Sequence, residues 1–168
     1  DLMTKKRSLY RQVVEAMASS KPGTWIILNV ASRFDPFWLR VTRGRFSAGS
    51  LLGFPSLMLT TIGAKTGLPR STALVFTRDG NGLVIVASRG GMDRHPGWYH
   101  NLKAHPEADV LLDGCSSTYT SYEATCEERE RLWAMVCDRY SGYTTYQKRA
   151  GDRQIPIMVL TPQVGQNK

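Results

Sequence analysis

"TALVFTRDGNGLVIVAS", residues 72–88, joins two short β-rich runs through the turn sequence Asp-Gly-Asn-Gly. Asp-Gly and Asn-Gly steps accept the positive φ angles that tight hairpin turns require. We therefore predict an antiparallel hairpin that pairs residues 72–77 with residues 82–88.

The rest of the chain after residue 55 continues the same pattern. Four more runs are rich in Val, Ile, Leu, Thr and Tyr and end at turn residues, namely residues 56–62, 108–113, 117–125 and 155–161. Helical patterns interrupt these runs only at residues 95–106 and 127–151, so the sheet is not a regular βαβ array. We predict an α+β fold, a mostly antiparallel six-stranded barrel with helical insertions.

The first third of the chain has a different character. Apolar residues at Leu9, Val13 and Met17 have helical spacing, and we predict a helical segment over residues 1–50, a barrel domain over 51–163 and a polar tail over 164–168. Residues 33–46 mix arginines with large aromatics. Two interpretations stay open for them: a helix packed on the domain, or a contact with an anionic membrane surface or a lipid-like substrate.

Charge and cysteine usage limit the class of protein. Lys plus Arg number 22 and Asp plus Glu number 14, a formal charge of +8, which favours anionic partners. No recognition motif for nucleic acid is present, and we expect no nucleic-acid partner. Cysteines at 115, 126 and 137 fit neither a zinc ribbon nor a disulfide framework, so the expected compartment is the cytoplasm.

The histidines raise the question of a metal site, because His95, His100 and His105 are evenly spaced. Five residues advance about 140° around a helix, so the three rings are expected to point in different directions. His95 and His105 each precede a proline, which disfavours helical conformation there. We predict a helix that begins at Pro96 and stops near Pro106, and no metal site.

Two glycine-containing connections carry candidate ligand contacts. In "TTIGAKTGLPRST", residues 60–72, Lys65 and Arg70 flank Thr66 and Gly67, an arrangement that suits either an anion-binding concavity or an ordinary loop with solvated charges. The order of residues is not that of a P-loop. In "VASRGG", residues 86–91, the glycines would let a ligand approach the backbone closely.

Two helical stretches carry the other candidates. Trp98, Asn101 and Lys103 would suit a planar acidic ligand, although an aromatic beside a leucine is also typical of a core. Tyrosines at 140, 143 and 146 near the end of the second stretch could wall a pocket or anchor a single long helix in the core.

Taken in order, "TTIGAKTGLPR", "ASRGG", "HPGWYHNLKAHP" and the late tyrosines before "IP" resemble the deazaflavin-dependent nitroreductase family of actinobacteria, from about Leu57 to Pro162. The resemblance implies a split β-barrel of the FMN-binding kind that binds coenzyme F420, an 8-hydroxy-5-deazaflavin. The phosphodiester and oligoglutamate tail of this coenzyme agree with the basic charge of the chain.

The resemblance also implies roles for particular residues. Lys65, Thr66 and Arg70 correspond to phosphate and tail contacts, Ser88, Arg89, Gly90 and Gly91 to the lining of the deazaflavin, Trp98, Asn101 and Lys103 to the rest of the groove, and Tyr140, Tyr143 and Tyr146 to the wall of the substrate pocket. The chain departs from the family pattern at Ala64, Arg89 and Gly97, which puts tail affinity and ring orientation in question.

The expected activity is transfer of a hydride from reduced F420 to a small electron-poor acceptor: a quinone, an activated enone or a nitroaromatic. Ser88 or a pocket tyrosine is expected to hydrogen-bond the acceptor oxygen. An FMN-dependent reductase or oxidase and a non-catalytic carrier of a deazaflavin or lipid-like ligand stay open as alternatives. The expected location is cytoplasmic, with association at the inner face of the membrane left open.

Overall fold

The computed structural model describes residues 55–163, together with Ser20 and Val41 as isolated positions. Apart from those two positions, the predicted helical segment 1–50, its aromatic and basic stretch, and the tail 164–168 lie outside the described residues. In the part that is described, no helix combines the length and the apolar character needed to span a bilayer.

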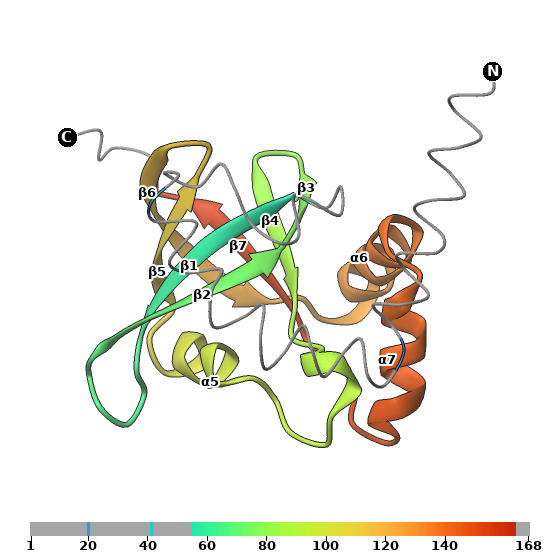
Figure 1. The fold of residues 1–168 in the computed structure, drawn as a ribbon. Coiled ribbons are helices and arrows are strands. Elements are labelled where there is room, and N and C mark those ends of the chain that lie inside the picture. Colours follow the sequence, from blue (N-terminus) through green and yellow to red (C-terminus); the bar gives the residue numbers. More distant parts are fainter. Residues whose placement is uncertain (1–19, 21–40, 42–54, 164–168) are drawn as a thin grey trace.

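One curled sheet forms the body of the molecule, with helices at its side and below it (Figure 1). Its strands lie in the order β2-β1-β5-β6-β7-β4-β3, and every neighbouring pair is antiparallel. The prediction of an antiparallel α+β fold is therefore confirmed. The strands are β1 (Ser56–Ile62), β2 (Pro69–Val75), β3 (Thr77–Asp79), β4 (Gly82–Val86), β5 (Glu107–Leu112), β6 (Cys115–Glu123) and β7 (Ile157–Pro162), and the helices are η2 (Arg89–Gly91), α5 (Gly97–Ala104), α6 (Cys126–Arg139) and α7 (Gly142–Ala150).

The connection from β2 to β3 shows why this sheet is a half-barrel. These two strands occupy opposite edges of the sheet, yet only Phe76 separates them in the chain. Since one residue cannot cross a flat seven-stranded sheet, the sheet must curl until the end of β2 lies beside the start of β3 at this corner. Phe76 places its ring in the core at this corner, and its N–H donates to Pro55 O.

The predicted hairpin exists but is shorter than expected, and the described sheet has seven strands where six were predicted. Residues 77–79 pair with β4 around Gly80, whose φ is 56°, whereas residues 72–75 belong to β2 and pair with β1. Phe76 divides the run because its buried side chain turns the chain from one edge to the other. A second tight hairpin, between β5 and β6, has positive φ angles at Asp113 and Gly114.

The apolar run of β4 is buried on both faces. Leu83 and Ile85 face one core cluster, inside the curl, which also contains Trp98 of α5. Val84 and Val86 face a second cluster, under α6 and α7. The alternation of strand side chains thus distributes one continuous hydrophobic run between two cores.

The stretch predicted as one long helix forms two helices. α6 ends at Arg139, Tyr140 is extended with φ −144°, and α7 begins at Gly142. The ring of Tyr140 lies over Gly142, in the space that a β-carbon there would need. The break lets Tyr140 contact Tyr143 and Tyr146 across the corner, with ring centroids 5.1 and 6.0 Å away.

Candidate functional site

The loop between β1 and β2 is fixed to α5 through one side chain. Asn101 accepts a hydrogen bond from the Ala64 N–H at 3.0 Å and donates one to Thr61 Oγ1 at 2.9 Å. Both ends of the Asn101 amide therefore hold the loop. Because the loop uses the backbone N–H of Ala64, this contact does not depend on the side chain at position 64, where the chain departs from the family pattern.

Two cations of this loop region are exposed. Within residues 55–163, neither Lys65 nor Arg70 makes an ion pair or a side-chain hydrogen bond, while four other cations there pair with carboxylates. Gly63 and Leu68 close the loop at its base through a 2.9 Å backbone hydrogen bond. The Thr66 hydroxyl accepts from the Leu68 N–H at 3.4 Å. The loop thus presents two uncompensated positive charges on an ordered turn.

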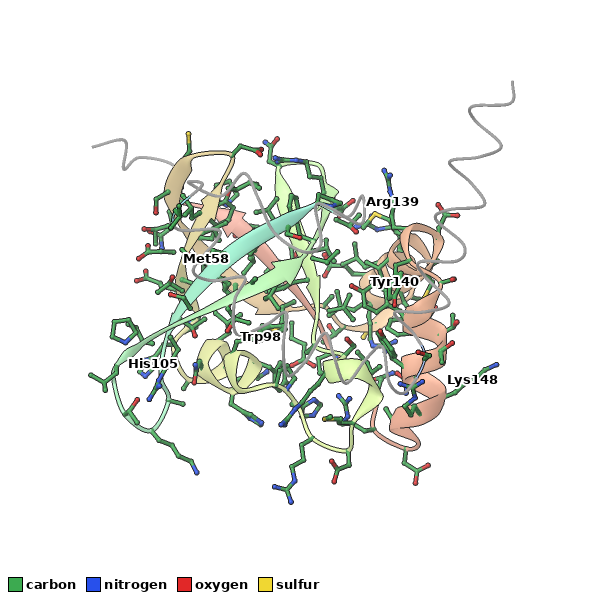
Figure 2. All side chains as sticks on the ribbon, viewed as in Figure 1. Met58, Trp98, His105, Arg139, Tyr140 and Lys148 are labelled. Carbon is green, nitrogen blue, oxygen red and sulfur yellow. The ribbon has the colours of Figure 1, made fainter. Side chains whose placement is uncertain are left out.

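Helix α5 lies below the sheet, between the β1–β2 loop and the η2 region (Figure 1). As predicted, it starts just after Pro96 and ends before His105. Trp98 is buried in the core, and Figure 2 shows it at the centre of the molecule. Lys103 pairs with Glu123 at 3.0 Å, so its charge is already compensated.

The expectation that the three histidines point apart is wrong for two of them. The rings of His95 and His100 are 5.9 Å apart, and His95 lies 4.7 Å from the ring of Tyr99. His95 precedes the helix, so helical angles do not govern its direction. His105 lies apart from these two rings, at the left edge of the molecule in Figure 2. Burial and a hydrogen bond to Glu123 raise the pKa of Tyr99 to about 12, which keeps this phenol protonated.

The turn after β4 has an unusual backbone. Ser88 is right-handed helical (φ −71°, ψ −40°), whereas Arg89 and Gly90 have φ angles of 47° and 64°. A right-handed residue followed by left-handed ones turns neighbouring N–H groups toward one side, the backbone arrangement found in anion-binding sites. No described residue accepts a hydrogen bond from the N–H groups of Ser88, Arg89 or Gly90, or pairs with the hydroxyl of Ser88. Ser88 and Gly90 are nevertheless buried.

This turn packs directly on α7. A β-carbon at Gly91 would lie 2.5 Å from Tyr146 O and 2.8 Å from Arg149 Cβ. Tyr146 is buried, and its hydroxyl is 3.0 Å from that of Tyr140. Burial also raises the pKa of Tyr143. The tyrosines therefore pack on the second core cluster and lie beside the 88–91 turn.

The structure brings the predicted residues together as two groups, on either side of α5. One group is the turn Ser88–Gly91, which contacts the helix of the tyrosine cluster. The other group is the β1–β2 loop region with Lys65, Thr66 and Arg70, which Asn101 fixes to α5. Trp98 packs in the core, and Lys103 points toward Glu123. Sequence analysis missed Arg153, which donates hydrogen bonds to the segment 87–95. A single arginine in a loop carries no sequence motif that would reveal this.

The model of a known family, described as F420H(2)-dependent quinone reductase, matches residues 36–162. The chain belongs to this family. The F420H(2)-dependent quinone reductase Rv1261c of Mycobacterium tuberculosis is 42% identical over 125 residues, which cover 73% of this chain and 83% of the relative. A second M. tuberculosis protein, putative F420H(2)-dependent quinone reductase Rv3178, is 30% identical over 118 residues, covering 70% of this chain and 98% of the relative.

Solved structures agree with this assignment. An F420-H2 dependent reductase (FDR-A) superposes with a TM-score of 0.58 at 36% identity, covering 63% of this chain and 93% of that protein. A structure described as a domain-swapped dimer has the same TM-score and identity, and the match covers 63% of this chain and 79% of that one. This member of the F420H(2)-dependent quinone reductase family is accordingly an F420-dependent reductase with a split-barrel fold, and F420 is its cofactor in place of the FMN alternative.

Replacing Asn101 of this reductase by alanine is expected to loosen the β1–β2 loop. Two hydrogen bonds are lost, so the free energy of unfolding should fall by about 2 kcal/mol, and amide hydrogen exchange should accelerate in residues 63–68. The variant Asn101→Asp keeps the acceptor for Ala64 and serves as the control with an intermediate effect. Unchanged exchange in Asn101→Ala would contradict the assigned role.

Proposed function

We propose that this protein reduces quinones with reduced F420, and that it also accepts other electron-poor acceptors such as activated enones and nitroaromatics. The names of the family and of its relatives support the quinone. The other acceptors share with quinones a low-lying acceptor orbital and an oxygen on which negative charge develops.

The observation that carries this proposal is the 88–90 turn. It holds a hydroxyl and three N–H groups without hydrogen-bond partners among residues 55–163, on a turn where Ser88 and Gly90 are buried and Arg89 is exposed. Donors that no described residue uses, gathered on one turn, are available to an electron-rich oxygen of a ligand. Donors fixed in advance stabilise charge that develops on an oxygen, because they need no reorganisation during the reaction.

The exposed cations Lys65 and Arg70 fit the anionic part of the cofactor. A phosphodiester and an oligoglutamate tail need cations that are not already compensated, and Lys65 and Arg70 meet this requirement. We assign the tail of F420 to the β1–β2 loop, including Thr66, and the deazaflavin to the segment Ser88–Gly91. Lys103 is already paired with Glu123, so we assign it a weaker electrostatic contribution to tail binding.

When bound, reduced F420 supplies the hydride. The chain has to hold the acceptor against the cofactor, exclude water and stabilise the developing charge. Ser88 is assigned to donate its proton in a hydrogen bond to the acceptor oxygen. Tyr140, Tyr143 and Tyr146 are assigned to the wall of the acceptor site, where the aromatic rings exclude water; burial raises the pKa of Tyr143 and keeps its phenol protonated.

Titration of the purified chain with oxidised F420 and, in parallel, with FMN tests the cofactor site. Saturable binding of F420 with little binding of FMN is the expected result. Oxidation of reduced F420 is then followed by absorbance with a naphthoquinone, an enone or a nitroaromatic as acceptor. Binding of F420 without turnover of any acceptor would contradict the proposed reaction and favour a carrier role.

Substitution of Ser88 by alanine is expected to lower kcat for quinone reduction about tenfold, since one donor is lost while the N–H groups remain. The dissociation constant of oxidised F420 should change less than the rate. Ser117→Ala, at an exposed position on β6, is the control. An unchanged kcat in Ser88→Ala would remove this hydroxyl from the mechanism.

A further inference from the structure

We propose that Arg153 is a positioning residue for the reaction: its guanidinium holds the segment 87–95 in the shape that presents Ser88 and the neighbouring backbone to the ligand. The proposal rests on the function assigned to Ser88–Gly91 above. Arg153 itself lies between α7 and β7 and is assigned no contact with the cofactor or the acceptor.

The contacts of Arg153 converge on one segment. Its guanidinium donates to Ser88 O at 2.8 Å, to Met92 O at 2.9 Å and to Ala87 O at 3.3 Å. It also lies 3.1 Å from His95 Nδ1. All four acceptors come from one loop, 58 to 66 residues earlier in the chain. A single side chain therefore spans both ends of the turn that contains η2.

The direction of these bonds determines where the backbone donors point. In a trans peptide the C=O of one residue and the N–H of the next point in opposite directions. Since Arg153 binds Ala87 O and Ser88 O, the N–H groups of Ser88 and Arg89 must face away from Arg153. Arg89 O accepts from the Met92 N–H, which in the same way directs the Gly90 N–H. Arg153 thereby directs the N–H groups of Ser88 and Arg89 toward the side on which a ligand would bind.

Arg153 is in turn held by α7. Its carbonyl accepts a hydrogen bond from Gln147 Nε2 at 2.9 Å, and its N–H donates to Ala150 O at 3.2 Å. Gln147 also accepts from the Ile155 N–H at 2.9 Å. Arg153 therefore links the helix that carries Tyr143 and Tyr146 to the turn that carries Ser88, beside a second link in which Arg149 of α7 donates to Gly90 O at 3.3 Å.

The chemistry of the contact needs an arginine. A guanidinium presents several donors in a rigid fork, whereas a lysine ammonium is a single point of charge. Burial and the positive charge of Arg153 lower the pKa of His95, which is consistent with a neutral imidazole that accepts a hydrogen bond at Nδ1. Arg89, whose φ of 47° is uncommon for a residue with a β-carbon, lies inside the span that the fork holds.

The test compares Arg153→Lys and Arg153→Gln with Arg131→Lys. Arg131 is the matched control because it also donates a fork, to Asp79 at 2.9 and 2.7 Å, but joins α6 to β3. Amide NMR spectra of residues 87–95 are recorded without cofactor, and the thermal melt and the dissociation constant of oxidised F420 are measured. The NMR readout does not depend on the assigned cofactor site, so failure of that assignment is distinguishable from failure of this inference.

In both Arg153 variants we expect a cooperative melt, shifted amide signals for residues 88–91, and F420 binding weakened about tenfold by loss of the charged fork. Arg131→Lys should leave the signals of this segment and F420 binding unchanged. Wild-type signals for residues 88–91 in Arg153→Lys and Arg153→Gln would overturn the proposal. Loss of the cooperative melt in both, with Arg131→Lys folded, would also overturn it, because Arg153 would then support the whole domain. Shifted signals with unchanged F420 affinity would overturn its role in ligand binding.

Discussion

Replacement of Lys65 and Arg70 together by glutamine should weaken the binding of F420 about a hundredfold, because two charge-assisted contacts to the anionic tail are lost. The loop itself should keep its shape, since Asn101 holds it through the backbone N–H of Ala64. The dissociation constant, measured by fluorescence titration at several salt concentrations, should also lose much of its dependence on salt.

The control removes the same amount of charge elsewhere. Arg139 and Lys148 lie on the side of α6 and α7, away from the β1–β2 loop (Figure 2). The double variant Arg139→Gln/Lys148→Gln therefore has the same formal charge as Lys65→Gln/Arg70→Gln. Equal loss of affinity in the two double variants would show that overall charge, and not the loop, attracts the tail.

Substitution of Gly91 by alanine is expected to reduce the free energy of unfolding by about 3 kcal/mol, through an unfavourable backbone conformation and overpacking. The φ of Gly91 is 78°, and the added β-carbon would lie 2.5 Å from Tyr146 O. The turn and α7 would have to separate, so F420 binding should weaken as well. Urea unfolding measures the first effect and fluorescence titration the second.

Gly97→Ala is the matched control for this variant. No atom lies within 4 Å of the β-carbon that alanine would add at Gly97. Its stability should equal that of the unsubstituted protein or exceed it, since alanine is the better helix former. The structure therefore has room for a larger residue at this departure from the family pattern. A stability of Gly91→Ala equal to that of Gly97→Ala would contradict the close packing of the turn on α7.

Local sequence patterns predicted much of the fold correctly. Short runs rich in β-forming residues and bounded by turn residues located most of the sheet, and Pro96 and Pro106 bracketed α5 as expected. The errors have tertiary causes. The run 72–77 divides between two strands because the edges of the sheet meet at Phe76, and the stretch 127–151 divides because Tyr140 packs over Gly142. Propensity is a local property and does not report such contacts.

For the candidate site, too, some features follow from the sequence and others only from the tertiary structure. The sequence by itself indicated the motifs to which we assign the chemistry, namely the cationic loop, the Ser88–Gly91 turn and the tyrosines, because their order along the chain resembles that of the family. Only the tertiary structure decided that Asn101 clamps a loop, that Trp98 and Tyr146 are buried, and that Arg153 holds the turn. These contacts join residues 37 to 66 positions apart, and their geometry depends on how the sheet curls.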